Sequence, residues 1–430
     1  MKKIILAIFS VVTVLIILIY ISVSSTSETF ETCEIVGKED AESIDFTKFK
    51  KVKVSASSLY NSNFIKNLLQ GENYREAWST PVTVPIVYLD TMYGGMEILK
   101  EGGGKQTHSL RLKAKNGIVY TLRSINKNPE KLIPEVADKL GLENIIIDGI
   151  SSQHPYAAPV VAKLANAVNV IHTNPQVYFV PKQTTLNTYN KKYGNRLYLL
   201  EYESEGPKNW TNLNNISEIL DTEDLQEMKV ENFDNLHINK EALVRARLFD
   251  LVIGDWDRHA KQWGWAIEQK DSTYLAHPVA ADRDNAFFSI DGLIPNLIAN
   301  KNVIAELQSF EENIDYMDGL VYDFDVYFLK NTNPEVFINQ AKFIQQNLTD
   351  EVIENALRYW NDELYDLYAK DISKKIKSRR DNLVEFAKRF STVINNKPLI
   401  QDALKGSDKD DVDPRIMNCF ECWNEKATYD

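Results

Sequence analysis

The feature that most constrains the fold is a run of segments between residues 239 and 290. Residues 239–253 place apolar side chains at helical spacing and stop at Gly254, which predicts a buried helix that ends at this glycine. Residues 262–267 and 273–276 are typical of the two strands of a hairpin. A helix that leads through a polar loop into a strand pair indicates a mixed α and β fold, with the loop beside a rigid element.

Carboxylates stand on both sides of this hairpin. Asp257 lies in the loop before the first strand, and Asp282 and Asp284 follow the second strand. The hairpin would carry the chain back and place Asp284 near Asp257. Phosphoryl transfer needs two such groups, because one carboxylate orients a hydroxyl and another holds Mg²⁺ on the nucleotide phosphates. The alternative is structural: a surface loop with an ion pair, followed by a solvated acidic turn.

The order of these groups predicts their roles. Asp257 is the candidate base that orients the acceptor hydroxyl, and Asp284 is the candidate metal ligand, with Asp282 as its substitute. His259 is included with Asp257 among the candidate catalytic residues, although His259 and Arg258 are expected mainly to brace the loop.

Five segments carry motifs that recur in a known group of proteins: Tyr74-Arg75-Glu76-Ala77-Trp78, Gly102-Gly103-Gly104-Lys105-Gln106-Thr107, His154-Pro155-Tyr156, His172-Thr173-Asn174-Pro175 and Gly254-Asp255-Trp256-Asp257-Arg258-His259. The chain resembles, over about residues 70–395, the atypical kinase-like group. This group includes the secretory-pathway kinases of the Golgi casein kinase type, the CotH spore-coat kinases, HipA and, more distantly, the phosphoinositide kinases. The closer resemblance is to the kinase-like domain of bacterial envelope proteins, some of them fused to metallophosphatase and BamA-type surface-antigen parts.

The resemblance implies a two-lobed, protein-kinase-like fold that uses ATP with Mg²⁺ or Mn²⁺. Gln262, five positions after Asp257, stands where related kinases place a metal-binding Asn or acid. Gln262 is therefore a candidate metal ligand, although an amide oxygen binds a metal more weakly than a carboxylate does. The acceptor would carry a hydroxyl and could be a protein, a glycan or a lipid.

A glycine run precedes a clear hairpin in the first half of the chain. Gly102, Gly103 and Gly104 would let backbone amides approach an anion, and Lys105 would add charge. The alternative is a flexible hairpin loop, and the run is not a Walker A sequence. Asn-Gly at 116–117, between alternating runs, predicts a tight hairpin. A glycine loop followed by a strand with a cation is the layout of a kinase small lobe.

Arg123 occupies the strand position where a kinase carries its phosphate-pairing lysine. Arg can grip a phosphate bidentately, so a nucleotide site remains possible, but the substitution also favours a pseudokinase. Lys113 and Arg111 are alternatives. The helical partner acid of Arg123 is expected to be Asp148 or Glu135.

A strand over residues 196–203 runs into a Gly-Pro break, which is typical of a hinge between lobes. Glu201 and Tyr202 would then present their backbone to the nucleotide base. The alternative is an ordinary edge strand. His154 and His172 are expected to be structural.

The N-terminus begins with Lys2 and Lys3 and continues without any charge from Ile4 to Val23. Such a run is long enough to cross a bilayer as a helix. The prediction is a single-pass membrane anchor with a cytoplasmic N-terminus and the globular part outside the cytoplasm. A cleaved signal peptide, which would release a secreted protein, is the alternative.

Composition limits the remaining choices. A net charge of −12 argues against nucleic acid as a partner, although ATP needs only local cations. The three cysteines do not form a disulfide scaffold, and Cys419 and Cys422 are expected to be a tail disulfide or free thiols.

These observations predict an α+β, two-lobed kinase-like fold with a β-rich small lobe and a mostly helical large lobe after an N-terminal transmembrane helix. The expected order is an anchor or signal at 1–24, a linker or stalk at 25–70, a small lobe at 71–205, a large lobe at 206–400 and a flexible tail at 401–430. The predicted function is phosphate transfer from ATP to a hydroxyl acceptor at the cell envelope. An inactive kinase-fold binding module (a pseudokinase) and nucleotidyl transfer are the alternatives.

Overall fold

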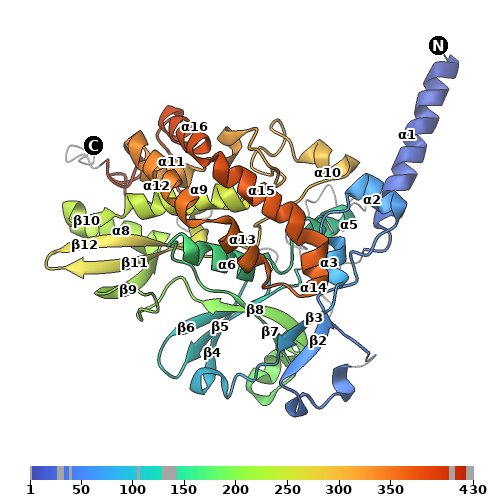
Figure 1. Ribbon diagram of the computed structural model, residues 1–430, viewed down its shortest axis with the longest axis horizontal. Coiled ribbons are helices and arrows are strands. Elements are labelled where there is room, and N and C mark those ends of the chain that lie inside the picture. The colour runs from blue at the N-terminus through green and yellow to red at the C-terminus, as the bar shows by residue number, and fades with distance from the viewer. Residues whose placement is uncertain are drawn as a thin grey trace.

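The computed structural model describes residues 2–26, 33–37, 41–103, 107–127, 143–405 and 412–422. Within these ranges the strands precede residue 281, and the chain after residue 290 is helical apart from its connections. Figure 1 shows the strands in the lower half of the view and most of the later helices above them. The predicted mixture of a β-rich part and a helical C-terminal part is therefore confirmed. Gly104, Lys105 and the helix expected around Glu135 lie outside the described residues.

A five-stranded antiparallel sheet has the order β4-β5-β6-β8-β7. Its strands are β4 (Met96–Gly102), β5 (Ser109–Ala114), β6 (Val119–Ser124), β7 (Gln176–Val180) and β8 (Arg196–Tyr202). The predicted Asn-Gly hairpin joins β5 to β6. Leu112, Leu122 and Leu200 are buried on one face of the sheet. Because side chains alternate along a strand, Arg123 and Glu201 lie on the opposite face.

A second sheet has the order β10-β12-β11-β9. Its strands are β9 (Ile216–Asp221), β10 (Leu236–Ile238), β11 (Trp263–Lys270) and β12 (Thr273–Ala280). The predicted hairpin is β11 and β12, which pair along their whole length, and both strands are longer than the sequence pattern indicated. A third sheet joins β1 (Glu34–Ile35), β2 (Lys51–Ser55) and β3 (Val82–Pro85).

The main hydrophobic core surrounds α9 (Lys240–Ile253), whose last eight residues are all buried. Before α9, the α-helices within the described residues are α1 (Lys2–Val23), α2 (Phe64–Gln70), α3 (Arg75–Ser79), α5 (Glu143–Asp148), α6 (Ala157–Ala167), α7 (Asn190–Tyr193) and α8 (Thr222–Asn232). Those after it are α10 (Leu293–Ile298), α11 (Asp323–Leu329), α12 (Pro334–Asn347), α13 (Asp350–Leu357), α14 (Asp362–Leu364), α15 (Lys370–Asp381) and α16 (Leu383–Asn396). Helices α12, α15 and α16 pack against α9 and enclose it.

Helix α15 carries a run of basic residues at 374–380, and one of them faces the core instead of the solvent. Arg379 is buried, donates hydrogen bonds to the carbonyls of Leu251 (2.8 Å) and Glu311 (2.6 Å), and lies over the ring of Phe310. Burial lowers its pKa to about 9. Arg379 therefore joins α15 to the end of α9.

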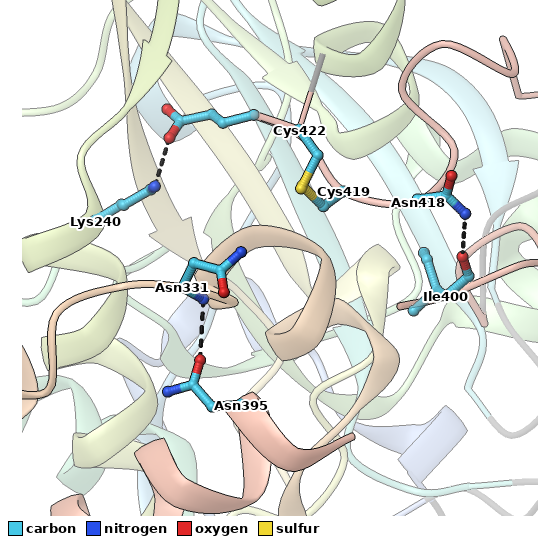
Figure 2. Close-up of a disulfide and its surroundings, with 8 residues drawn as sticks. Lys240, Asn331, Asn395, Ile400, Asn418, Cys419 and Cys422 are labelled. Carbon is cyan, nitrogen blue, oxygen red and sulfur yellow. Dashed lines mark hydrogen bonds and ion pairs between the residues drawn. A yellow bond between two sulfur atoms is a disulfide. The ribbon is translucent and has the colours of Figure 1, made fainter. Parts of the chain in front are cut away.

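The C-terminal segment 412–422, which was expected to be part of a flexible tail, packs on the helical part. Cys419 and Cys422 form a disulfide, as Figure 2 shows, and Phe420 between them is fully buried. The amide of Phe420 donates to the carbonyl of Tyr327 (3.1 Å), and Lys240 forms an ion pair with Glu421. The predicted tail disulfide is present, and it closes a turn that holds an aromatic side chain in the core.

Helix α1 projects away from the rest of the molecule (Figure 1). Of the helices in the described residues, it is the one long and apolar enough to cross a membrane. Its side chains are exposed until Ser22 and Val23, which are buried where the helix meets α2. This junction lies in the segment for which the sequence had indicated a linker.

Candidate functional site

Helix α9 delivers the Asp257 loop, defined as residues 255–259. The helix begins at Asn239, whose side chain accepts a hydrogen bond from the amide of Ala242, and ends at Gly254 in the left-handed conformation (φ 67°). A Cβ at Gly254 would lie 2.5 Å from the ring of Phe310, so the position excludes larger residues. The chain therefore leaves the helix by a sharp turn into the loop.

A buried ion network, which we call the Asp250 cluster, fixes this loop. Asp250 pairs with Arg247 (3.0 Å), Arg258 (3.2 Å) and Arg283 (2.9 Å), and all four side chains are buried. Arg247 also pairs with Asp325 on α11 (2.6 Å). Burial opposes ionisation of Asp250, but the three arginines outweigh it and lower the pKa of this carboxyl. One carboxylate from α9 thus holds an arginine from each of two loops.

These two arginines join the Asp257 loop to the acidic segment, defined as residues 281–285. Arg258 also donates to the carbonyl of Ala281 (2.8 Å), and the amide of Ala281 donates to the carbonyl of Gln262 (3.0 Å). The backbone of Gln262 consequently lies beside the start of the acidic segment. That Asp284 lies near Asp257 stays a prediction.

Asp257 and His259 lie together at the surface of the loop. Their side chains are 27% and 24% exposed, and the Nε2 atom of His259 is 3.7 Å from Asp257 Oδ1. The amide of Asp257 donates to Asp255 (3.2 Å). Burial lowers the pKa of His259, despite the opposing effect of Asp257. A neutral imidazole and an accessible carboxylate are available to a reacting group here.

Five residues form a second group, which we call the charged cluster: Arg123, Lys127, Glu201, Asp282 and Asp284. Arg123 pairs with Glu201 (3.0 Å) and with Asp282 (2.6 Å). Lys127 pairs with Asp284 (2.7 Å). The cluster therefore joins two strands of the five-stranded sheet to the acidic segment that follows β12.

The acidic segment has a strained backbone and an unsatisfied oxygen. Asp282 adopts φ 52°, a conformation that is unusual for a residue other than glycine. Its Oδ1 atom is buried and has no hydrogen-bond partner among the described residues. Burial raises the pKa of Asp282 to about 7, against the influence of Arg123. A buried carboxylate oxygen that accepts no hydrogen bond is available to bind a cation.

Lys127 is the functional candidate that the sequence reasoning missed. It lies just after β6, and its side chain is 7% exposed at the ion pair with Asp284. A second cation four positions after Arg123 was visible in the sequence. What the sequence did not show is that the chain beyond β6 passes the acidic segment.

Of the two predicted helical partners of Arg123, Asp148 is wrong, and Glu135 lies outside the described residues. Asp148, at the end of α5, pairs with Lys66 (2.8 Å) and Arg75 (2.8 Å) instead. Arg123 takes Glu201 from the neighbouring strand, because Thr121 lies opposite Glu201 and places Arg123 diagonally across from it.

Gly102 and Gly103 lie at the same end of the sheet as Arg123. Gly102 pairs with Ser109, and Ser109 pairs with Arg123. Gly103 has φ 121° and closes onto the backbone of Thr107, an approach that a Cβ would block. The glycines are thus next to the charged cluster, while Gly104 and Lys105 lie outside the described residues.

Glu201 and Tyr202, at the end of β8, already form hydrogen bonds and a ring contact with other residues of the chain. Glu201 accepts from the hydroxyl of Thr173 (2.5 Å), and the amide of Tyr202 donates to the carbonyl of Thr173 (2.8 Å). The ring of Tyr202 stacks on Trp210, with 4.6 Å between ring centroids. A role for this backbone in binding a nucleotide base stays a prediction.

The described residues contain no group of three or more His, Cys, Asp or Glu side chains arranged as a metal site. The candidate ligands are the two carboxylates of the acidic segment, Asp282 and Asp284, and the amide of Gln262. Two carboxylates suit Mg²⁺, which usually keeps several waters and binds substrate phosphates.

No protein-family model matches the chain, and no curated protein does. The solved structures that are similar to it include the following two. The proinflammatory kinase CtkA of Helicobacter pylori is 15% identical over 69% of this chain and 96% of its own, with a TM-score of 0.33. HipA of Shewanella oneidensis, from a toxin–antitoxin complex with HipB and operator DNA, is 11% identical over 69% of this chain and 67% of its own, also with a TM-score of 0.33.

Proposed function

We propose that this chain is a membrane-anchored, atypical kinase-like protein that transfers phosphate from ATP to a hydroxyl acceptor. The observation that carries the proposal is the charged cluster, in which Arg123 on β6 and Lys127 just after it meet two carboxylates of the acidic segment. Arg258 of the Asp257 loop donates to the first residue of that segment. Phosphoryl transfer is catalysed almost entirely by positioning and electrostatics, and it needs cations for the phosphates, a metal-binding acid and a group that orients the hydroxyl.

Arg123 and Lys127 would hold the phosphates, and Asp284 and Asp282 would hold Mg²⁺ or Mn²⁺, with Gln262 as a further ligand. When bound, the metal ion neutralises charge on the phosphate oxygens. The unsatisfied oxygen of Asp282 supports this assignment. Asp257, partly exposed beside His259, would accept the proton of the acceptor hydroxyl.

Nucleotide binding would exchange partners within the charged cluster. Each cation is now paired with a carboxylate. A nucleotide with its metal brings both opposite charges, so phosphates would replace Asp282 on Arg123 and Asp284 on Lys127, while the metal replaces the cations on these two carboxylates and Glu201 stays paired with Arg123. No charge is then left unpaired in the buried part of the site.

A pseudokinase is the second candidate. Arg123 in place of lysine and the amide of Gln262 in place of a stronger ligand favour it, as do the existing ion pairs, because they satisfy the site without a ligand. In this case the chain would bind nucleotide, or a partner, without turnover.

The membrane part of the proposal rests on α1. Lys2 and Lys3 precede the apolar run and would keep the N-terminus in the cytoplasm. Gln70 donates to the hydroxyl of Ser22 (3.0 Å), and Lys66 donates to that of Thr26 (3.0 Å). These buried contacts favour a retained anchor over a cleaved signal, because the end of the helix takes part in the folded body.

The test uses the full chain in detergent with Mn²⁺ and with γ-labelled or α-labelled ATP. Asp257→Asn and Asp284→Asn should each lower transfer from γ-labelled ATP by about 100-fold or more. Asp271→Asn, in the exposed β11–β12 turn, is the matched control and should transfer normally.

Other outcomes distinguish the alternatives. Retention of the α label would indicate nucleotidyl transfer, and binding without transfer of either label would indicate a pseudokinase. No binding and no transfer would overturn the nucleotide-dependent function.

A further inference from the structure

A groove of about 680 Å³ opens between α2 and α10, next to the point where α1 joins the body. Its apolar lining is unusually accessible: Phe64 is 82% exposed, Leu68 60%, Leu293 50% and Leu297 64%. Large apolar side chains that gather on a surface mark an interaction site. None of the residues that line the groove belongs to the charged cluster or to the Asp257 loop.

The two short helices form one unit with the end of α1. Gln70 and Lys66 of α2 hold Ser22 and Thr26 through hydrogen bonds of 3.0 Å each. Helix α2 ends at Gly71 (φ 91°), where a Cβ would collide with the backbone of Asp291, just before α10. The amide of Glu72 donates to Asp291 as well (3.2 Å). The groove therefore cannot move independently of α1.

Figure 1 shows α2 at the base of α1 and α10 beside it, on the side of the body from which α1 projects. Exposed apolar side chains continue from the last turns of α1, where Ile17 and Ile21 are each 51% exposed, to Phe64 and Leu297. If α1 spans a bilayer, this surface lies at the level at which the chain leaves the hydrocarbon.

We propose that the α2–α10 groove docks onto the surface of the same lipid bilayer that holds α1, with its apolar side chains inserted at the acyl boundary. The inference rests on the proposed anchor. The polar lining residues Asn67, Glu72 and Asn296 suit the headgroup region, since an interfacial element has one apolar and one polar side. Glu72 and Asp291 make an uncharged, zwitterionic surface the better match than an anionic one.

The experiment uses the full chain in phosphatidylcholine nanodiscs. Cys33 is buried and Cys419 is bonded to Cys422, so under non-reducing conditions one introduced thiol can be labelled selectively. An environment-sensitive fluorophore is attached at Leu297→Cys, and quenching is measured with lipids that carry a nitroxide near the headgroup. Leu99→Cys on β4, 44% exposed, is the matched control, and Ile21→Cys, near the end of the apolar run, reports on α1 at the level of the headgroups.

We expect the Leu297 probe to shift to the blue and to be quenched about twofold or more, as for a side chain inserted 5–10 Å into the interface, while the Leu99 probe is unaffected. A Phe64→Cys probe should behave like Leu297. If the α1 probe is quenched and the Leu297 probe is not, the docking surface is refuted and the anchor stands. A blue shift at Leu297 without quenching would mean that protein, such as a second copy, covers the groove, and would also refute lipid docking. If neither probe is quenched, both the anchor and the docking surface fail.

Discussion

Asp250 is the side chain on which both candidate loops depend, although it would touch no substrate. Asp250→Asn would leave Arg247, Arg258 and Arg283 buried around a neutral amide. Removing one partner of a buried ion network costs about 3–5 kcal/mol. We expect a loss of this size in the free energy of unfolding, measured by urea denaturation of the full chain in detergent. Glu363→Gln, at an exposed ion pair with Lys53, should change it by less than about 0.5 kcal/mol. An equal effect of the two substitutions would contradict this role of Asp250.

His154 makes a separate prediction about pH. Its ring is buried, stacks on Trp360 with 4.4 Å between centroids, and accepts a hydrogen bond from the amide of Tyr156 (3.1 Å). Burial lowers its pKa to about 3. Between pH 6.5 and 3 the unfolded chain therefore binds a proton that the folded chain does not, so stability is lost as the pH falls through this range.

At pH 5 the lowered pKa of His154 should reduce the free energy of unfolding by about 2 kcal/mol. His154→Phe keeps a flat ring but cannot titrate. Its free energy of unfolding should therefore fall less than that of the unmodified chain between pH 7 and pH 5, in parallel denaturation series. Equal slopes would show that His154 is protonated in the folded state.

Single residues were predictable where their neighbours in sequence reveal their chemistry. Asp257, Asp284 and Arg123 stand in motifs, and the structure brings Arg123 into contact with the acidic segment. Lys127 and Glu201 could not be placed, because their partners come from strands and loops far away in the chain. The wrong assignment of Asp148 has the same cause: a helical acid was expected to pair with Arg123, but packing of α5 against α2 and α3 pairs it with Lys66 and Arg75.

Among the elements, those bounded by caps and turns were the easiest to predict. Asn239 and Gly254 bound α9, and the Asn-Gly turn fixes the β5–β6 hairpin. The burial of Arg379 on α15 was missed, because a run of basic residues in the sequence does not reveal which one faces the core. How the three sheets lie relative to one another could not be predicted, because it depends on contacts between residues far apart in the sequence.

Helices α2, α3 and α5 meet at one buried acid, and this junction is testable. Asp148 neutralises Lys66 and Arg75, and all three side chains are buried. Asp148→Asn should lower the free energy of unfolding by about 3–5 kcal/mol and speed amide hydrogen exchange in α2. Lys48, in an exposed pair with Asp45, supplies the control Lys48→Gln, which should leave exchange in α2 unchanged. Unaltered exchange in α2 after Asp148→Asn would contradict a shared junction.

The last described residues of the chain, up to Cys422, pack back on the rest of the molecule. The carbonyl of Lys405 accepts from the amide of Ala260 (3.4 Å), directly after the Asp257 loop, and Phe420 is seated between Tyr327 and Phe328. The disulfide restricts the turn that presents Phe420. Because the loop that the disulfide closes is so short, reducing the disulfide should lower the free energy of unfolding by only about 2 kcal/mol.

We therefore expect a mild reductant to increase amide hydrogen exchange in residues 412–422, and Cys419→Ser to do the same without reductant. Burial raises the pKa of the Cys33 thiol to about 12, so alkylation after reduction should label Cys419 and Cys422 but not Cys33. Exchange that is unaffected by reduction would show that packing of Phe420 alone holds the segment.

The junction at Ser22 and Thr26 has a consequence for the reach of the protein. A catalytic body on a long slack tether sweeps a wide volume and meets acceptors at many heights above a membrane. Here Ser22 and Thr26 are hydrogen-bonded to α2 of the body, so an inserted α1 would restrict the distance between the Asp257 loop and the membrane. Acceptors would then be chosen by where their hydroxyls stand relative to the lipid surface, before any contact with the site distinguishes them.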